Sequence, residues 1–295
     1  MFPLLLQSSD GSWSIASYPV FLICGWLCAA WYVRVYSTRS KFDHPRKFQW
    51  FWAAAFFSWL GGRFFWVSFH HETFVQGASI FLWDAGQSSS WAELWILVIV
   101  SVLGCIKARV AALRWLDCMV PTWLIVQVFE RLGAFFSGGD FGLVTDSFWG
   151  IQFPKGSPAD QFHRNKMIGV VISEHASLAV HPVQLYGVLT MTAMVMIVCY
   201  LQFRSTLPGA IPSGSNQPGT IFKVSMLGYA ISRLLFEDPF KLDRSPNVLG
   251  PIRGDQFMSM AVIVAMLLAL RGSLRKTVRR SKYSAAPDRI SRSPK

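Results

Sequence analysis

The sequence predicts an all-α integral membrane protein with seven transmembrane helices and a folded loop region on the outer face between helices four and five. Three observations support this fold class. Of the 295 residues, 52% are hydrophobic and 15% are charged, whereas soluble domains carry about 25% charged residues. The chain holds 13 tryptophans and 24 phenylalanines, whose rings favour bilayer interfaces. Its positive charges are also concentrated in alternate loops.

Seven segments are long and apolar enough to be membrane spans, because a helix needs about 20 mostly apolar residues to cross a bilayer core. The third, sixth and seventh are short and are expected to cross with little tilt. We find no internal repeat and no separate soluble domain, so residues 1–270 are predicted to form one membrane domain. The predicted spans are Tyr18–Tyr36, Phe48–Phe69, Trp91–Ile106, Leu116–Phe136, Pro182–Leu201, Ile221–Phe236 and Gln256–Leu270.

The loop charges predict the orientation of the chain. Basic residues follow the first, third and fifth spans and fill the tail at 271–295, whereas the other loops mix signs. The positive-inside rule therefore places the N-terminus outside and the C-terminus in the cytoplasm of a bacterial inner membrane. This pattern explains most of the net charge of +12. The tail is predicted to be disordered, and to act as a topology signal or contact anionic lipids rather than nucleic acid.

The segments outside the spans carry few signals of their own. Glycines and prolines in the outer loop, at about 137–181, predict an irregular but folded segment, and residues 207–219 resemble a flexible linker. The five cysteines lie in apolar runs without metal-ligand spacing, so we expect no metal site, cofactor or disulfide framework. The N-terminus lacks the basic start of a signal peptide, so the first span is expected to remain as a helix.

Ionisable residues inside apolar spans are costly and are therefore functional candidates. Tyr229, Arg233 and Glu237 are spaced i, i+4 and i+8, which places them on one face of an α-helix. An ion pair that only fixes helix packing is the alternative explanation. Arg63, Arg131 and Arg233 lie toward the outer ends of three different helices, and guanidinium groups suit a lipid phosphate. We therefore expect Arg131 to hold a phosphate at headgroup depth.

Two further acidic residues receive a structural interpretation. Glu93 is expected to face the membrane interface near Trp91 and Trp95. Asp117 is expected to extend toward the cytoplasmic surface beside Arg114.

In chain order, the motifs "GGRFFWVSFH", "LWDAGQSS", "RLGAFFSGGDFG", "HPVQLY" and "YAISRLLFE" resemble the bacterial prolipoprotein diacylglyceryl transferase family between residue 61 and about 240. The resemblance implies a seven-span inner-membrane enzyme. Such an enzyme moves diacylglycerol from phosphatidylglycerol to the cysteine thiol of a lipoprotein precursor and releases glycerol-1-phosphate. Lipid and precursor are then the partners, together with membrane lipids.

The sequence departs from the family's motifs at several polar positions. Ser90 stands at the position of a histidine that is important for activity in the family. Ala134 and Ser137 replace two asparagines, and Gly139 and Gly187 replace two acids. The arginines of the motifs are retained.

The resemblance and the residue types together suggest catalytic roles for Arg131 and Arg233 on the phosphate, with Glu237 orienting Arg233. His181 is a candidate base, although His-Pro can also cap the fifth helix, and His70 and His71 are rival bases. The candidate substrate-binding residues are Tyr18, Arg63, Gly133, Gly142, Gln184, Tyr186 and Tyr229.

Three functions are compatible with these residues. The first is the diacylglyceryl transfer that the resemblance implies. The second is a related phosphatidylglycerol-dependent transfer to another acceptor, and the third is a catalytically inactive lipid-binding paralogue. A transporter is less consistent with the sequence, because there is no inverted repeat and no pair of broken helices.

Overall fold

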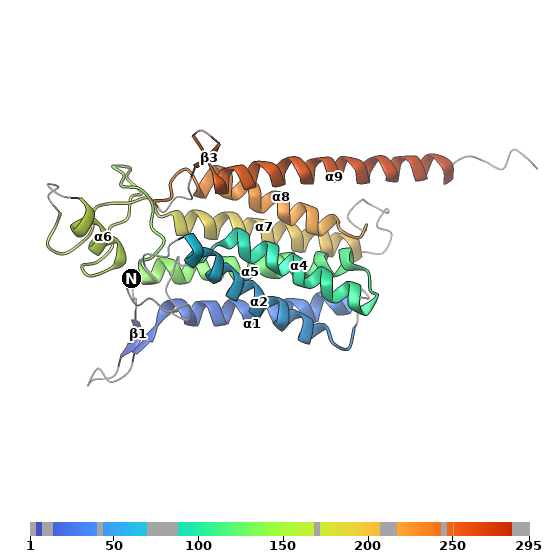
Figure 1. Cartoon of the computed structure of the whole chain (residues 1–295), viewed down its shortest axis with the longest axis horizontal. Helices are drawn as coiled ribbons and strands as arrows, with labels where there is room; N and C mark the ends of the chain where they lie inside the picture. Colours follow the sequence, from blue (N-terminus) through green and yellow to red (C-terminus); the bar gives the residue numbers. More distant parts are fainter. Residues whose placement is uncertain are drawn as a thin grey trace, which may run out of the picture.

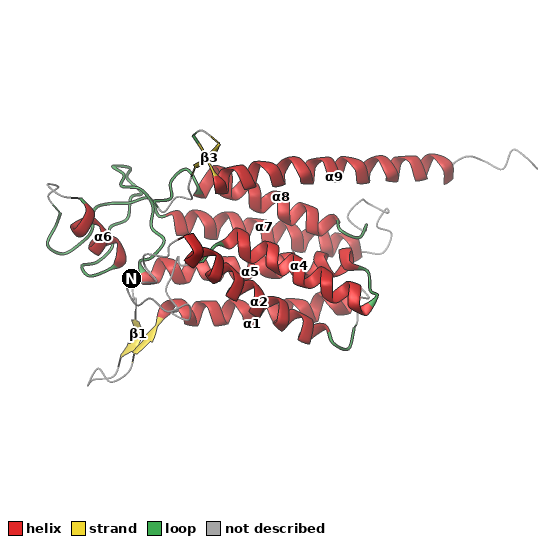
Figure 2. Ribbon diagram, viewed as in Figure 1, coloured by secondary structure: helices red, strands yellow, loops and turns green. Residues whose placement is uncertain are grey.

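The computed structural model describes residues 4–7, 14–39, 44–69, 88–167, 172–206, 217–242, 247–249 and 251–284. Within these residues the fold is almost entirely helical, with two short antiparallel hairpins (Figures 1 and 2). The strands are β1 (Leu4–Gln7), β2 (Ser14–Ala16), β3 (Asn247–Leu249) and β4 (Ile252–Arg253). The helices are α1 (Ser17–Arg39), α2 (Lys47–Phe69), α4 (Ser90–Ala108), α5 (Ala112–Ser137), α6 (Pro158–Lys166), α7 (Val183–Thr206), α8 (Thr220–Ser232), the π-helix η2 (Arg233–Glu237) and α9 (Gly254–Ser284).

Every predicted span corresponds to a helix, the sixth being formed by α8 and η2 together. Among the described residues, five helices are long and apolar enough to cross a membrane by length and composition: α1, α4, α5, α7 and α9. The prediction of an all-α membrane protein is therefore confirmed. The remaining two predicted spans, α2 and α8 with η2, do not meet the same limits.

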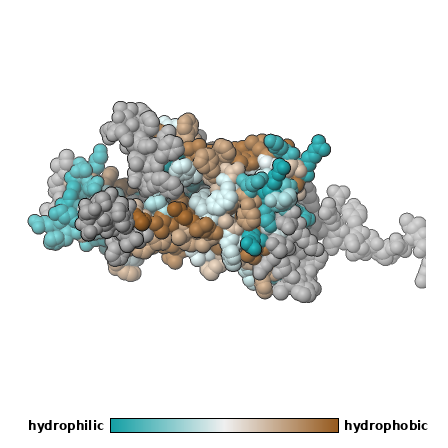
Figure 3. All heavy atoms as spheres, turned by 90° about the horizontal axis from the view of Figure 1, so that it is seen from below, coloured by the Kyte–Doolittle hydropathy of each residue, from teal (hydrophilic) through white to brown (hydrophobic). Residues whose placement is uncertain are grey.

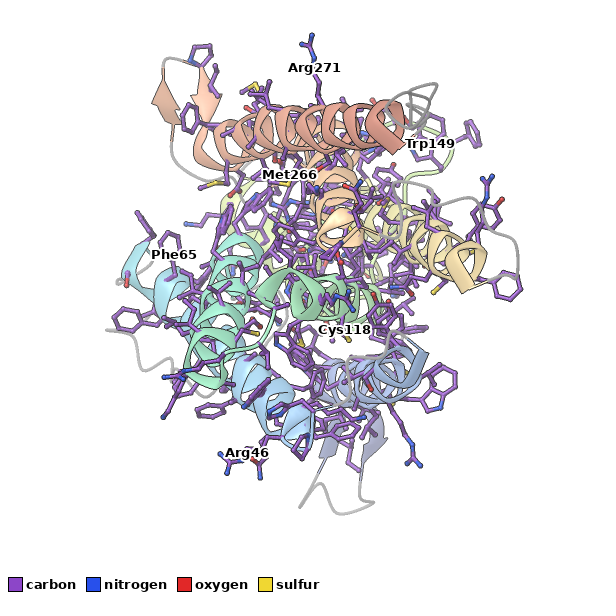
Figure 4. The ribbon with its side chains drawn as sticks, turned by 90° about the vertical axis from the view of Figure 1, so that its right-hand side faces the viewer. Arg46, Phe65, Cys118, Trp149, Met266 and Arg271 are labelled. Atoms are coloured by element: carbon purple, nitrogen blue, oxygen red, sulfur yellow. The ribbon has the colours of Figure 1, made fainter. Side chains whose placement is uncertain are left out.

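Helix α5 is the central helix of the bundle. Its most apolar window is 67% buried, compared with 11–39% for the other four candidate spans. It packs against α1, α4, α7 and α8, and in the end-on view Cys118 of α5 lies inside the bundle while Phe65 and Arg271 point outward (Figure 4). A residue near the end of α5 can therefore contact several helices at once.

The outer surface of the bundle is apolar where lipid would contact it. Large exposed hydrophobic side chains occur on all the long helices, including Trp31, Phe56, Leu103 and Leu189. One face of the molecule shows a hydrophobic band across its middle, with hydrophilic residues toward both ends (Figure 3). This distribution is typical of a helix bundle in a bilayer.

Successive long helices run in alternate directions, so the end of the bundle that carries α6 gathers several helix ends (Figure 1). The chain leaves α5 at Gly138, which has φ of 77°, and Asp140 follows with φ of 51°. These left-handed residues turn the chain into a folded segment. This segment has its own small core of Phe153, Ala159 and Val180, so it is folded, as its glycines and prolines predict.

Two expectations about the opposite end are corrected. Asp117 is buried and does not extend to the surface: its carboxylate accepts the backbone N–H groups of Gly219 at 2.7 Å and Phe222 at 2.8 Å. It thus satisfies N–H groups at the start of α8 that have no partner within α8 itself. The tail is also helical as far as Ser284, because α9 continues past Leu270. Residues 207–216 and 285–295 lie outside the described residues.

Candidate active site

Arg131 of α5 and Arg233 of η2 are brought together by Glu237. Arg131 Nη2 lies 2.8 Å from Glu237 Oε2, and Arg233 Nη1 lies 3.5 Å from the same oxygen. The side chains of all three residues are at most 5% exposed. The predicted Arg233–Glu237 pair is therefore present, but the nearer partner of the glutamate is Arg131.

The ion pairs continue on both sides of Glu237. Arg131 Nη1 also pairs with Asp140, which in turn accepts Lys241 Nζ at 2.7 Å. Arg233 Nη2 lies 3.0 Å from Asp238 and 3.7 Å from Asp255. We call the connected set the arginine network: Arg131, Arg233, Asp140, Glu237, Asp238, Lys241 and Asp255.

A π-helical turn shapes this network. The backbone N–H of Asp238 donates to the carbonyl of Arg233 at 2.9 Å, an i to i+5 bond. The regular α-helical face predicted for residues 229, 233 and 237 therefore ends at Arg233. Such π-turns occur often at functional sites. Here the wider turn lets Glu237 face Arg131 while Asp238 faces Arg233.

Some donors of the network remain unused. Arg233 Nε is buried and has no hydrogen-bond partner among the described residues. Arg131 Nη2 forms an ion pair with Glu237 Oε2, but it donates no hydrogen bond of good geometry to any described residue. A buried donor without a partner costs about 1–3 kcal/mol. Unused guanidinium donors of this kind suit a bound anion.

Asp140 and Gly187 fix the position of Arg131. A Cβ atom on Gly187 would lie 3.2 Å from Arg131 Cγ and 3.3 Å from Cδ, so the bare glycine accommodates the arginine stem. Burial opposes ionisation of Asp140, but the charges of Lys241 and Arg131 prevail and hold its pKa below the ordinary value. Asp140 and Lys241 were not among the predicted site residues. The only signal for Asp140 is an acid directly after two glycines at a helix end.

The "HPVQLY" motif supports the network from outside without contacting its arginines. Gln184 Nε2 donates to the Gly139 carbonyl at 2.6 Å, next to Asp140. His181 Nδ1 lies 3.1 Å from the Tyr186 hydroxyl, and both rings pack against Phe240, next to Lys241. Burial lowers the pKa of His181. No contact between His181 and Arg131 or Arg233 is present in the described structure.

The other predicted substrate-binding residues have packing roles in this structure. A Cβ atom on Gly133 would lie 3.2 Å from Tyr18 Cα, so this glycine allows α1 to approach α5. A Cβ atom on Gly142 would lie 2.5 Å from the His181 carbonyl oxygen, so a glycine is needed where these two backbone segments meet. Tyr229 is fully buried edge-on against Trp91 and Trp123, at centroid distances of 4.9 Å and 4.5 Å. Its hydroxyl has no hydrogen-bond partner among the described residues.

A second polar region, here called the carboxyl pocket, is formed by Tyr18, Arg63, Ser88, Glu93 and Glu130. These residues line one pocket between α1, α2, α4 and α5. The expectation that Glu93 faces the membrane interface is wrong, since the residue is only 7% exposed and points into this pocket. Arg63 thus lines this pocket, beside the arginine network. Rival bases His70 and His71 lie outside the described residues.

Comparisons with known proteins agree with the motif resemblance. The family model described as prolipoprotein diacylglyceryl transferase matches residues 3–271. A phosphatidylglycerol–prolipoprotein diacylglyceryl transferase of Rhodospirillum rubrum is 26% identical over 291 residues, covering 93% of this chain and 90% of the relative. Enzymes of the same name from Xylella fastidiosa and Tropheryma whipplei are 27% and 24% identical, covering 74% and 73% of each chain.

Proposed function

Because the chain belongs to the prolipoprotein diacylglyceryl transferase family, we propose that it transfers the diacylglyceryl group of phosphatidylglycerol to the cysteine thiol of a lipoprotein precursor. Glycerol-1-phosphate is the second product. The observation that carries the proposal is the pair of buried arginines on one carboxylate, with hydrogen-bond donors left over. A phosphate diester at headgroup depth is an anion that fits these donors.

In this reaction the sulfur forms a bond to the glyceryl carbon, and the bond between that carbon and the phosphate oxygen breaks. Negative charge therefore grows on the departing phosphate. Arg131 and Arg233 stabilise that charge, and they do so more strongly than they would in water because the site is buried. Asp140 and Glu237 hold the guanidinium groups in place before the lipid binds, so little reorganisation is needed.

The proposed topology has seven spans, with the N-terminus outside and the tail in the cytoplasm. The alternation of basic and mixed loops supports it. The arginine network would then lie at the outer end of the bundle, where the thiol of a translocated precursor is available. A cysteine introduced at residues 155–165 should react with an impermeant reagent from outside, and one after Arg275 should not; the reverse pattern contradicts the topology.

The test of function uses the full chain in nanodiscs with phosphatidylglycerol labelled in its glycerol headgroup. A peptide with a lipobox cysteine is offered, beside the same peptide with serine in place of cysteine. We expect release of labelled glycerol phosphate and a mass increase of one diacylglyceryl group on the cysteine peptide alone.

The other functions predict different results. Release of glycerol phosphate without modification of the peptide would indicate another acceptor. Binding of phosphatidylglycerol without release would indicate an inactive lipid-binding protein. Both alternatives follow from the sequence, because Ser90, Ala134, Gly139 and Gly187 stand where the family has other polar residues.

A further inference from the structure

The transfer requires a base near the thiol, in addition to the phosphate site. A free cysteine thiol has a pKa of about 8.5 and is mostly protonated at neutral pH, whereas the thiolate is the nucleophile. The acids of the arginine network are ion-paired with its cations. Glu237 Oε1 has no hydrogen-bond partner among the described residues, but protonation of Glu237 would weaken its ion pairs with Arg131 and Arg233. A carboxylate outside the network is therefore the more suitable base.

The carboxyl pocket adjoins the network and differs from it in chemistry. Glu130 directly precedes Arg131 on α5, so the two regions share a helix turn. Glu93 interacts electrostatically with Arg63 and Glu130 of the pocket and with Arg131 of the network. The enclosed part of the pocket has room for a group of about the size of one water molecule, which is also the scale of a thiol.

Glu93 is held in the pocket from two sides. Gly62 of α2 makes space for it, because a Cβ atom there would lie 2.2 Å from Glu93 Cγ and 2.9 Å from Oε1. Ser88 donates a hydrogen bond to Oε1. The second oxygen, Oε2, has no hydrogen-bond or ion-pair partner among the described residues. A pocket-lining carboxylate with one oxygen unpartnered can accept a proton from a group that enters the pocket.

The other carboxyl group of the pocket is already occupied. Glu130 Oε1 accepts the Tyr18 hydroxyl at 3.5 Å, and its Oε2 accepts Gln127 Nε2. His181 lies between Tyr186 and Phe240, outside the pocket lining. Glu237 Oε1 is also unpartnered among the described residues, but Glu237 does not line the pocket. Glu93 thus combines a place in the pocket lining with an unpartnered oxygen.

We propose that Glu93 is the base that takes the proton of the acceptor thiol, with the thiol entering the carboxyl pocket beside Arg63. This inference rests on the proposed function. The proton moves from sulfur to Glu93 Oε2, the sulfur forms its bond to the glyceryl carbon, and the carbon–oxygen bond to the phosphate breaks. The electron pair leaves with the glycerol phosphate on Arg131 and Arg233. Glu93 then returns its proton to water.

Glu93→Gln tests the proposal, because glutamine keeps the size and the contact with Ser88 but is not a base. General-base catalysis contributes about 100- to 10,000-fold, so we expect kcat per folded molecule to fall at least about 100-fold at pH 7. The KM for phosphatidylglycerol should stay unchanged, because the arginine network is intact. The rate of the variant should rise about tenfold per pH unit toward pH 8.5, since hydroxide then ionises the thiol.

Glu130→Gln is the matched control, since it removes the same charge from the same pocket without removing the free oxygen. It should lower kcat by less than about tenfold and leave the pH profile parallel to that of the unmodified protein. The charged and titratable groups that face Glu93 are Arg63, Glu130, Arg131 and Tyr18, and all remain in place in Glu93→Gln.

The outcomes separate the two proposals. If the unmodified protein does not modify the lipobox peptide, both proposals fail. If it does, and Glu93→Gln retains more than half of kcat or loses activity without recovery at high pH, only the role of Glu93 fails. Should Glu93→Gln not fold, Glu93→Asp keeps a carboxylate. That variant must keep the pH profile of the unmodified protein, and a tenfold rise per pH unit would overturn the role of Glu93.

Discussion

The arginine network and the carboxyl pocket lie at the same end of the bundle, but their charges are partnered differently. In the network each cation contacts at least one acid within 4 Å, and Glu237 joins two arginines. In the pocket, two glutamates share the space with Arg63, and one oxygen of Glu93 is unpartnered within the described residues. The first arrangement holds cations still, and the second leaves a basic atom available.

This difference assigns separate tasks to the two regions. Fixed cations suit an anion whose charge grows during the reaction, because the donors need not reorganise. A partly satisfied carboxylate suits a proton transfer, because its basicity is not consumed by an ion pair. Changes in the network should therefore affect lipid chemistry at every pH, whereas changes at Glu93 should depend on pH.

Among the alanine and amide substitutions in the arginine network, the largest effect is expected for Arg233→Ala. It removes a phosphate contact and leaves Asp238 buried without its cation; losing a charged partner in a buried site costs about 2–4 kcal/mol, or roughly 30- to 1,000-fold in rate. Release of glycerol phosphate per folded molecule should fall by this amount between pH 6.5 and 8.5, without recovery at high pH. Recovery of the rate at high pH would contradict the separate roles proposed for the arginine network and the carboxyl pocket.

Glu237→Gln should have a smaller effect, because glutamine keeps a carbonyl acceptor near both arginines and the arginines keep their charge. We expect a loss of about tenfold in the same measurement, which corresponds to roughly 1.4 kcal/mol. If Glu237→Gln were as damaging as Arg233→Ala, the glutamate would take part in the chemistry itself, and its assignment as a positioning residue would be wrong.

Asp140 should link the network to acid stability. Its pKa is lowered by Lys241 and Arg131, so its ionised form stabilises the folded state above the ordinary aspartate pKa of about 3.9. That contribution is lost as the pH falls through the lower folded-state pKa. The unfolding temperature in detergent should therefore fall more steeply below pH 4 for the unmodified protein than for Asp140→Asn. Parallel curves would show that Asp140 is not held as an anion.

The smallest effect on activity is expected for Asp117→Asn, outside both regions. The amide keeps one acceptor for the start of α8 but loses the charge, so stability should fall by about 1 kcal/mol. Thermal unfolding should report the loss, and activity per folded molecule should stay within about twofold. A larger loss of activity would mean that this end of the bundle is energetically coupled to the site.

The sequence predicted the helices and the arginines well for one physical reason. Charged residues in apolar runs are rare and costly, so Arg131 and Arg233 stand out without any structure. The spans are equally visible, because hydropathy acts over many consecutive residues. The pairing of Arg233 with Glu237 followed from helical spacing, although the π-turn that directs Glu237 to Arg131 leaves no clear mark in the pattern.

The residues that were missed depend on tertiary contacts. Asp140 and Lys241 are 101 positions apart in the chain and meet because the loop after α5 passes beside the end of η2. Glu93 has Trp91 and Trp95 as local neighbours, which favours an interfacial interpretation. Its burial follows from Gly62 on another helix, and a local pattern does not contain that information.

Replacement of Arg131 by lysine tests the phosphate role most directly. Lysine keeps the charge, but its single ammonium group cannot present the two parallel donors that a phosphate diester engages. Arg109→Lys is the matched control, because Arg109 is exposed at the end of α4. Release of labelled glycerol phosphate per folded molecule should fall roughly 30- to 1,000-fold in Arg131→Lys, for a loss of about 2–4 kcal/mol, and stay unchanged in Arg109→Lys. Normal release by folded Arg131→Lys would contradict the phosphate role and leave Arg131 as a residue that only packs the bundle.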